Sequence, residues 1–143
     1  MKTKLLNADY PKTYAVVFQN GDEAIAGLQA FAADAKLAAS QVTGIGAVRE
    51  AVLGYFDWER KDYRRIAVPE QSEVVSLLGD VTCGPEGREL HLHAVLARRD
   101  GTALGGHLLA AYVRPTLELI VTESPGYLQR RFDPETKLAL IGI

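Results

Sequence analysis

One segment of this chain has the pattern of a helix, and every other patterned segment has the pattern of a strand. Asn20, with Glu23 three residues later, is typical of a helix N-terminal cap, and an alanine-rich run follows to about Ala39. The apolar stripe of this run, at helical spacing, consists of Ile25, Leu28, Phe31 and Ala35. A single helix cannot build a helical bundle, so the core must rest on a sheet.

The remaining patterned segments are rich in β-branched and apolar residues and are separated by glycine, proline and charged turns. They span residues 13–18, 42–48, 51–56, 66–69, 73–81, 90–98, 103–113 and 116–122. After these, Pro125-Gly126 and Asp133-Pro134 interrupt the C-terminal stretch, so periodicity assigns it no element. We therefore predict a single α+β domain over residues 1–143, with one long helix packed on a largely antiparallel sheet.

Composition limits the class of protein. With 48% hydrophobic and 24% charged residues, the chain can fill a core and is not disordered. The single cysteine, Cys83, excludes a disulfide framework and a multi-cysteine zinc site, and we interpret it as a small filler rather than a nucleophile. No apolar run approaches the roughly 18 residues that span a bilayer. The N-terminus has no secretory pattern, so a cytoplasmic location without membrane contact is expected.

The three histidines, His91, His93 and His107, lie close together in the sequence. His91 and His93 share one face of a strand because side chains alternate with a period of two. If Arg99-Asp100-Gly101 is a three-residue hairpin loop, Arg98 pairs with Thr102 and His93 lies opposite His107. The three imidazoles then converge. A two-residue turn, or a bulge at Gly105-Gly106, would instead turn His107 to the other face.

Three neutral imidazoles with a fourth position open are the ligand set of an open zinc site. We therefore predict one divalent metal ion, zinc, on His91, His93 and His107. The alternative interpretation is polar packing on a half-exposed strand, or hydrogen bonds across a subunit interface.

Three segments carry a resemblance to a known family. They are Glu73-Val74-Val75-Ser76-Leu77-Leu78-Gly79-Asp80-Val81, Leu90-His91-Leu92-His93-Ala94 and Asp100-Gly101-Thr102-Ala103-Leu104-Gly105-Gly106-His107-Leu108-Leu109. This pattern resembles the plant-and-prokaryote conserved (PPC, or PCC) domain, and the layout matches from about Thr13 to the C-terminus. The resemblance implies an α+β domain that assembles as a homotrimer. It also implies a description as a DNA-binding protein and, as in some prokaryotic members, a metal on the three histidines.

Two departures from the plant proteins weaken the DNA-binding expectation. The chain has no Arg-Gly-Arg-Pro core of an AT-hook, the part that enters the minor groove. Where the plant domain has a Gly-Arg-Phe-Glu-type stretch for partner contacts, this chain has Glu70-Gln71-Ser72-Glu73. Sixteen Lys and Arg against eighteen Asp and Glu give a net charge of −2, which also argues against binding nucleic acid through bulk charge.

Two further groups of residues are candidates for function. The only cluster of basic and aromatic residues contains Trp58 and Tyr63 together with Arg60, Lys61, Arg64 and Arg65, and these four basic residues are the candidate nucleic-acid contacts. Acidic residues are interleaved with them, which favours a solvated loop or edge strand. Glu118 lies in an apolar strand, and a tight turn at Arg114-Pro115 would place it on the face of His107. There it would orient a ligand or act as a general base, although an outward-facing Glu is the more common situation.

These observations predict a stand-alone, trimeric PPC-like protein with a three-histidine metal site and weak DNA binding. One alternative is a metal-dependent enzyme that acts on a small molecule through metal-bound water. Another is a purely structural metal. No Ser-His-Asp order, phosphate loop or dinucleotide fingerprint is present, so the sequence contains no complete catalytic constellation.

Overall fold

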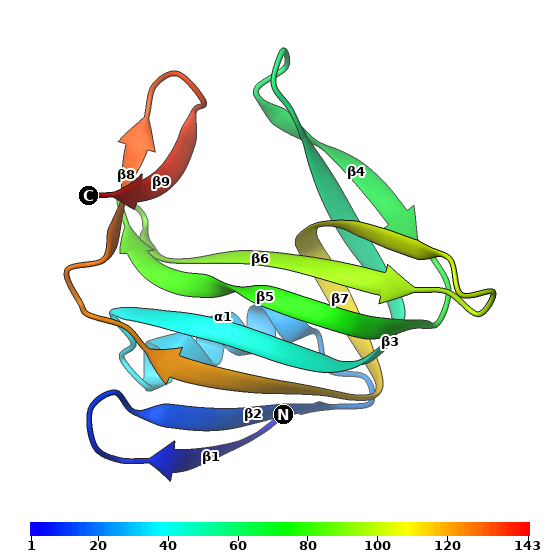
Figure 1. The fold of residues 1–143 in the computed structure, drawn as a ribbon, viewed down its shortest axis with the longest axis horizontal. Coiled ribbons are helices and arrows are strands. Elements are labelled where there is room, and N and C mark those ends of the chain that lie inside the picture. The colour runs from blue at the N-terminus through cyan, green and yellow to red at the C-terminus, as the bar shows by residue number, and fades with distance from the viewer.

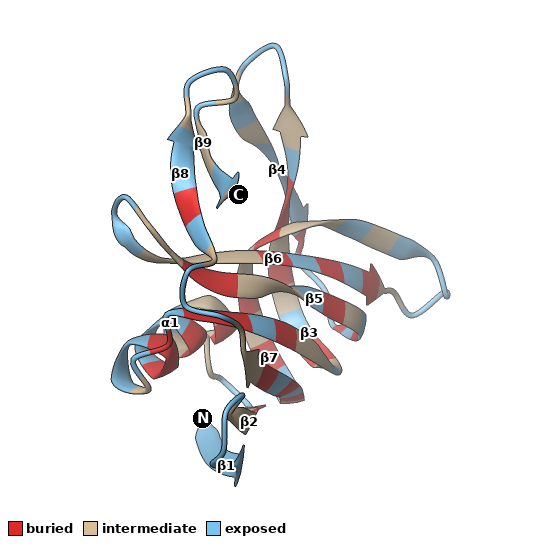
Figure 2. Cartoon of the chain, turned by 60° about the vertical axis from the view of Figure 1, so that its left-hand side comes forward, coloured by how far each residue is buried: buried red, intermediate tan, exposed pale blue.

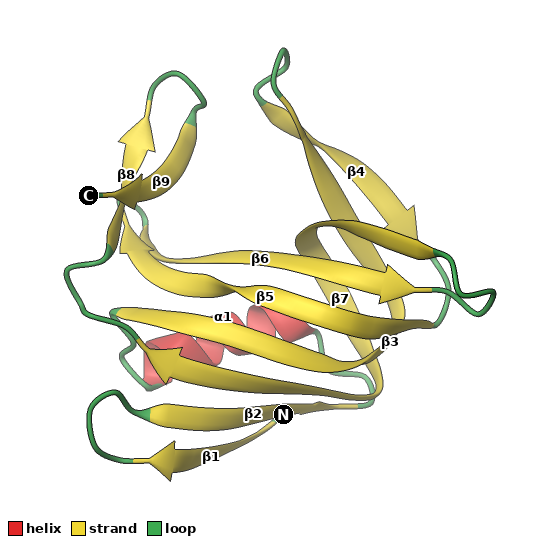
Figure 3. Ribbon diagram, viewed as in Figure 1, coloured by secondary structure: helices red, strands yellow, loops and turns green.

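The structure, a computed structural model, describes residues 1–143 as one helix and one nine-stranded sheet (Figures 1 and 3). The helix is α1 (Ala24–Asp34). The strands are β1 (Lys2–Asn7), β2 (Thr13–Gln19), β3 (Ala39–Asp57), β4 (Asp62–Val68), β5 (Ser72–Gly84), β6 (Gly87–Ala97), β7 (Ala103–Glu123), β8 (Gln129–Asp133) and β9 (Leu138–Gly142). The predicted single helix on a mostly antiparallel sheet is confirmed.

The two longest strands, β3 and β7, run antiparallel through the middle of the sheet. β7 pairs with β3 along most of its length, with β6 at its start and with β2 along its second half. Because β3 also pairs with β5, and β5 with β6, these four strands form a closed circuit of pairings. The sheet therefore curls back on itself, which is visible as the sharp bend of β7 in Figure 1.

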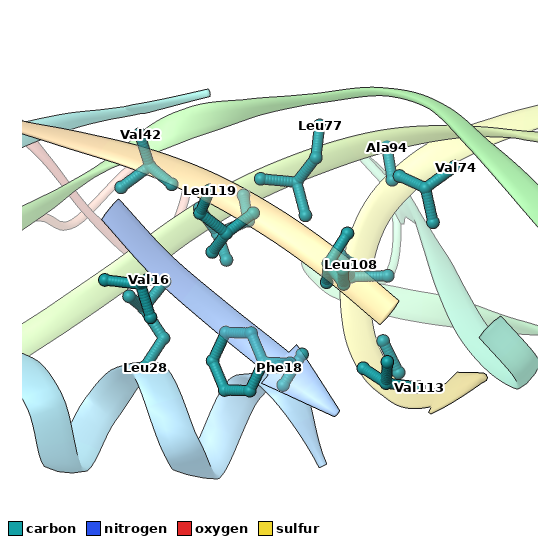
Figure 4. Close-up of a cluster of buried hydrophobic side chains, with 14 of the residues drawn as sticks. Val16, Phe18, Leu28, Val42, Val74, Leu77, Ala94, Leu108, Val113 and Leu119 are labelled. Atoms are coloured by element: carbon teal, nitrogen blue, oxygen red, sulfur yellow. The ribbon is translucent and has the colours of Figure 1, made fainter. Parts of the chain in front are cut away.

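The core lies between α1 and one face of this sheet. Leu28 of the helix and Val16 and Phe18 of β2 are fully buried, and Figure 4 shows them packed together beneath Leu119. Side chains alternate between the two faces along β6. Leu92, Ala94 and Leu96 therefore lie in the core, and His91 and His93 lie on the opposite face. The face of the sheet that carries the histidines is therefore the one that the helix does not cover.

One row of cross-strand neighbours crosses this outer face from the histidines to β2. His107 pairs with His93, His93 with Leu78, and Leu78 with Thr43. Thr43 in turn pairs with Ile120, which pairs with Ala15. Side chains directly opposite each other on paired strands share a face, so the histidines adjoin the apolar part of the outer face.

The helix is shorter than the sequence predicts. Its N-cap is Glu23, whose carboxylate accepts from the Ala26 N–H at 2.6 Å, rather than Asn20. The preceding residues are held by β7 instead, because Gly21 N donates to the Val113 carbonyl and Val113 N to the Asp22 carbonyl. The helix ends at Asp34, and the segment near Ala39 belongs to β3.

Several strands differ from their predicted bounds. The segments 42–48 and 51–56 are one strand, β3, and the expected turn at Arg114-Pro115 lies inside the continuous strand β7. The ladder with β3 continues past Val113 after a register shift, so backbone pairing carries the strand through the proline. The C-terminal stretch forms the hairpin β8–β9, and β1 adds an edge strand that no pattern indicated.

Two hairpins project from the sheet. The outer parts of β3 and β4 form one of them, and β8 and β9 form the other (Figure 1). Both are largely exposed, unlike the central strands (Figure 2). No helix of the structure is long and apolar enough to cross a membrane.

Candidate metal centre

The hairpin between β6 and β7 determines where the histidines lie. Gly101 has a φ of 82°, the left-handed conformation that glycine adopts without penalty, and Arg98 N donates to the Thr102 carbonyl at 2.8 Å. The loop therefore has three residues, as predicted, and His93 lies directly opposite His107. The two alternatives, a two-residue turn and a bulge that shifts this register, are wrong.

The three imidazoles converge. His91 and His93 approach with their Nε2 atoms 3.2 Å apart, and one ring nitrogen from each histidine lies within 4.8 Å of the others. The ring centroids of the three pairs are 5.1, 5.3 and 5.4 Å apart. A tetrahedral zinc with bonds of about 2.0–2.1 Å needs ligand nitrogens about 3.3–3.4 Å apart, so small side-chain adjustments suffice.

Burial favours the neutral form of two of these rings, His107 and His91. Burial, with smaller contributions from the neighbouring His91, His93 and Arg130, lowers the pKa of His107 to about 4. The pKa of His91 is also lowered, mainly by burial and then by Arg130 and His93, while Asp80 opposes the shift. His107 Nδ1 is buried without a hydrogen-bond partner. Two rings that favour the neutral form and an unpartnered ring nitrogen fit a metal ion.

Tyr63, from the projecting strand β4, covers one side of the histidines. Its ring lies 4.6 Å from that of His107 with an interplanar angle of 30°. Burial raises the pKa of Tyr63, against a smaller opposite effect of Arg130, so the hydroxyl stays protonated and is a hydrogen-bond donor. The sequence placed this tyrosine in a basic cluster, because nothing in the local pattern shows that β4 folds over β7.

Arg130, from β8, lies on the other side and was not predicted. Its side chain is only 5% exposed, and Nη2 lies 2.8 Å from Asp80 Oδ1 and 3.2 Å from His91 Nδ1. Nη1 donates to the Ala139 carbonyl at 2.9 Å, which ties β8 to β9. A buried arginine is nearly always paired, so its burial would have indicated a partner such as Asp80. The sequence alone does not show that Arg130 is buried.

A pocket of about 150 Å³ opens between the two projecting hairpins, beside His91 and His107. Its walls are both polar and apolar. They consist of Tyr63, Glu89, Leu90, His91, His107, Arg130, Leu138, Ala139 and Leu140. A ligand in this pocket would contact the histidine rings, the tyrosine and the arginine together.

The sequence of the chain matches one protein family. The model of the Plants and Prokaryotes Conserved (PCC) domain matches residues 7–125, which include all three histidines and the hairpin between them. The chain belongs to the PCC-domain family. The match ends before β8, so Arg130 lies outside the part that it covers. No protein with a curated description matches the chain.

Solved structures of similar proteins share the fold of this PCC-domain protein. A putative DNA-binding protein from Bacteroides thetaiotaomicron is 28% identical, with a TM-score of 0.89 over 98% of this chain and 96% of its own. The metal-containing protein AF0104 from Archaeoglobus fulgidus is 31% identical, with a TM-score of 0.85 over 98% and 99%. A PPC protein from Pyrococcus horikoshii is 26% identical, with a TM-score of 0.84 over 99% and 95%.

Glu118 of the PCC-domain protein lies apart from the histidines. It is exposed and pairs with Ile45 and Val17, in the half of β7 that lies beyond Pro115. It lines a separate groove on the outer face, and His91 and His107 line the pocket described above. Since β7 continues through the predicted turn, the strand carries Glu118 away from His107. Cys83 is half-buried at the end of β5, without a histidine beside it in the ladder.

The basic cluster lies on the β3–β4 hairpin, at its tip and along β4. Lys61 Nζ lies 3.2 Å from the centre of the Trp58 ring, a cation–π contact, and Asp57 accepts from the Glu59 and Arg60 N–H groups. Arg64 and Arg65 follow on β4 and are exposed. The four basic residues therefore form a protruding, solvated surface. Tyr63, on the same strand, is the residue of this hairpin whose ring contacts that of His107.

Proposed function

We propose that this PCC-domain protein binds one divalent metal ion, zinc, per subunit through His91, His93 and His107. The observation that carries the proposal is the 3.2 Å separation of the His91 and His93 ligand nitrogens with His107 directly opposite. Neutral imidazole suits zinc, although copper, nickel and iron accept the same donors. The description of AF0104 as a metal-containing protein supports it.

The pocket favours a second function, metal-dependent chemistry on a small molecule. Zinc held by three protein ligands supplies a Lewis acid with an open coordination position. Around it, Tyr63 would donate a hydrogen bond, Arg130 would supply positive charge, and the leucines of β9 would exclude water. A purely structural metal, by contrast, needs no pocket beside it.

Zinc content tests the proposal. Protein purified without a histidine tag and loaded at about pH 7.5 should hold one zinc per chain by elemental analysis, and His93→Ala should remove most of it. His93 is the central ligand, since it contacts His91 and pairs with His107. Glu118→Gln is the matched control, because it changes an acidic residue on the same sheet without touching the histidines. Wild-type protein without stoichiometric zinc would show that the site is polar packing.

We further propose a homotrimer, with a cytoplasmic location. Large apolar side chains remain exposed on the face of the sheet that the helix does not cover: Ile45, Val75, Leu78, Val95 and Ile120. An apolar area of this kind on a soluble protein marks an interaction surface. A second copy of the chain is the occupant that the family resemblance favours.

DNA binding is a weaker part of the proposal. It is supported by relatives described as putative DNA-binding proteins and by Arg60, Lys61, Arg64 and Arg65 on the projecting hairpin. The net charge of −2 and the acidic residues in the same hairpin oppose it. Any contact with duplex DNA would therefore be electrostatic and independent of sequence.

A further inference from the structure

Arg130 is held in an arrangement that leaves its donors poorly matched. Nη2 lies 2.8 and 2.9 Å from the two carboxylate oxygens of Asp80 and 3.2 Å from His91 Nδ1. This nitrogen carries two hydrogens, so three acceptors compete for two donors. Nε of the same side chain is buried with no partner at all. The guanidinium can therefore gain hydrogen bonds by moving.

The contact between Arg130 and His91 is incompatible with a metal ion on His91. Arginine only donates, so the contact requires a free lone pair on His91 Nδ1. A neutral imidazole that binds an ion through Nε2 carries its hydrogen on Nδ1, and one that binds through Nδ1 has no lone pair left there. In both cases Arg130 loses its hydrogen bond to His91.

Asp80 is placed to take over His91. The two residues are directly opposite each other on β5 and β6. A carboxylate accepts about four hydrogen bonds, and Asp80 receives two from Arg130 and one, at 3.3 Å, from Thr82 Oγ1. One acceptor position remains for the His91 Nδ1–H. A carboxylate that accepts from a metal-bound histidine fixes the ring and strengthens it as a ligand.

We propose that metal binding transfers His91 from Arg130 to Asp80, and that the guanidinium, no longer shared with His91, then binds a small carboxylate in the adjoining pocket. This inference rests on the proposed metal site. Arg130 lines the pocket together with Tyr63, and the planar guanidinium matches the two oxygens of a carboxylate. The added charge of the ion favours an anion there.

The size and lining of the pocket limit this ligand. Its volume of about 150 Å³ equals about five waters at roughly 30 Å³ each. Leu90, Leu138 and Leu140 contribute apolar side chains to the pocket wall. The ligand class is therefore a short monocarboxylate with a small apolar or hydroxylated tail, bound only when the metal is present.

Zinc affinity tests the transfer of His91. Asp80→Asn should weaken zinc about 10–100-fold, the usual cost of losing such a partner. Arg130→Met removes a competitor for His91 and a like charge, so zinc should bind as tightly as to wild type, or up to about tenfold more tightly. Arg131→Met, at the exposed next residue of β8, is the control and should change nothing. A tenfold loss in Arg130→Met, or none in Asp80→Asn, would overturn the proposal.

Acetate tests the ligand. Cobalt-loaded wild-type protein should change its visible spectrum when acetate is added, and metal-free protein should bind no acetate by calorimetry. Arg130→Met should bind acetate at least about tenfold more weakly, and Arg131→Met as wild type does. Arg130→Lys keeps the charge beside Asp80 but lacks the fork, so it should fold normally and also lose acetate affinity.

The outcomes separate the two proposals. Wild-type protein that binds neither zinc nor cobalt would refute the metal site itself. Normal metal binding with acetate affinity unchanged in both Arg130 variants, or with equal acetate affinity in metal-free protein, would refute only the role of Arg130.

Discussion

At the scale of single residues, the imidazole of His107 shows how burial prepares this site. Most histidines exchange a proton near pH 6.5. His107 lies under the Tyr63 ring and next to two other imidazoles, and its pKa falls to about 4. Protons therefore compete with a metal ion for His107 only at a pH well below the one at which they would compete for an exposed histidine.

The same shift predicts acid sensitivity of the metal-free fold. In the unfolded chain His107 takes up a proton near pH 6.5, whereas in the folded chain it stays neutral down to about pH 4. Protons therefore favour the unfolded chain, and the contribution to stability that is complete above pH 6.5 is lost as the pH falls to 4. Denaturant titrations of metal-free protein across this range should show the loss.

His107→Asn is the variant that isolates this effect. Its unfolding free energy should fall less between pH 6.5 and 4 than that of wild type, because one of the shifted groups is gone. The carboxyl groups with a lowered pKa, including Asp100 and Asp133, are present in both proteins, so their contribution cancels when the two pH profiles are compared. Parallel pH profiles for the two proteins would contradict the assignment.

The sequence predicted the histidines but not the residues around them. A period of two and a three-residue loop suffice to bring His93 opposite His107, because both are local properties of one hairpin. Tyr63 and Arg130 come from strands far away in the chain and reach the site only through tertiary packing. No spacing rule relates them to His91, so their roles required the structure.

At the scale of elements, the close approach of β5 to β6 supports the histidine strand. A Cβ added at Gly79 would lie 2.0 Å from the His91 carbonyl oxygen and 2.8 Å from Leu92 Cα. Both are backbone atoms and cannot rotate away. Gly79 is therefore required for β5 and β6 to pair beside His91.

Gly79→Ala should destabilise the protein by about 1–3 kcal/mol, the usual cost of overpacking, and reduce zinc binding as well. Gly105→Ala is the matched control, since the nearest atom to its Cβ would be 3.6 Å away, an ordinary contact. Thermal unfolding and zinc titration of both variants provide the measurement. Equal stability of the two would show that β5 and β6 can separate without cost.

Elements were predicted well where they are short and regular and poorly where long strands continue through breakers. The apolar stripe at Leu28 and Phe31 identified the helix, but its ends depend on β7 and β3, which compete for the flanking residues. A local sequence pattern predicts a turn at Pro115, but this residue lies within β7. Ladder pairing with distant strands decides such cases, and it is invisible in a local window.

At the scale of the whole molecule, the uncovered sheet face predicts assembly. Leu78 and Ile120 are 55% and 44% exposed and flank Thr43 in one row across the sheet. Leu78→Glu should shift the trimer towards monomer in light scattering, because it buries a charge in the interface. Tyr127→Glu, on a loop and 84% exposed, is the control and should stay trimeric. A monomeric wild type at micromolar concentration would refute the trimer.

The distribution of charge over the molecule predicts weak DNA binding. Duplex DNA should bind only at low salt, without sequence preference, and the salt slope should decrease when Arg64 and Arg65 are both replaced by Gln. As the control, another pair of basic residues, Arg98 and Arg99 on the β6–β7 loop, is replaced by Gln in the same way. Nanomolar, sequence-specific binding in a gel shift at physiological salt would contradict this prediction.

The row that joins His107, His93 and Leu78 has a consequence for any measurement of affinity. The proposed metal ligand His93 and Leu78, a residue of the proposed trimer interface, are direct cross-strand neighbours. Ordering one side chain then lowers the entropic cost of ordering the other, and the linkage is reciprocal. The zinc concentration at half-saturation should rise on dilution of the protein, and chelation should promote dissociation of the subunits.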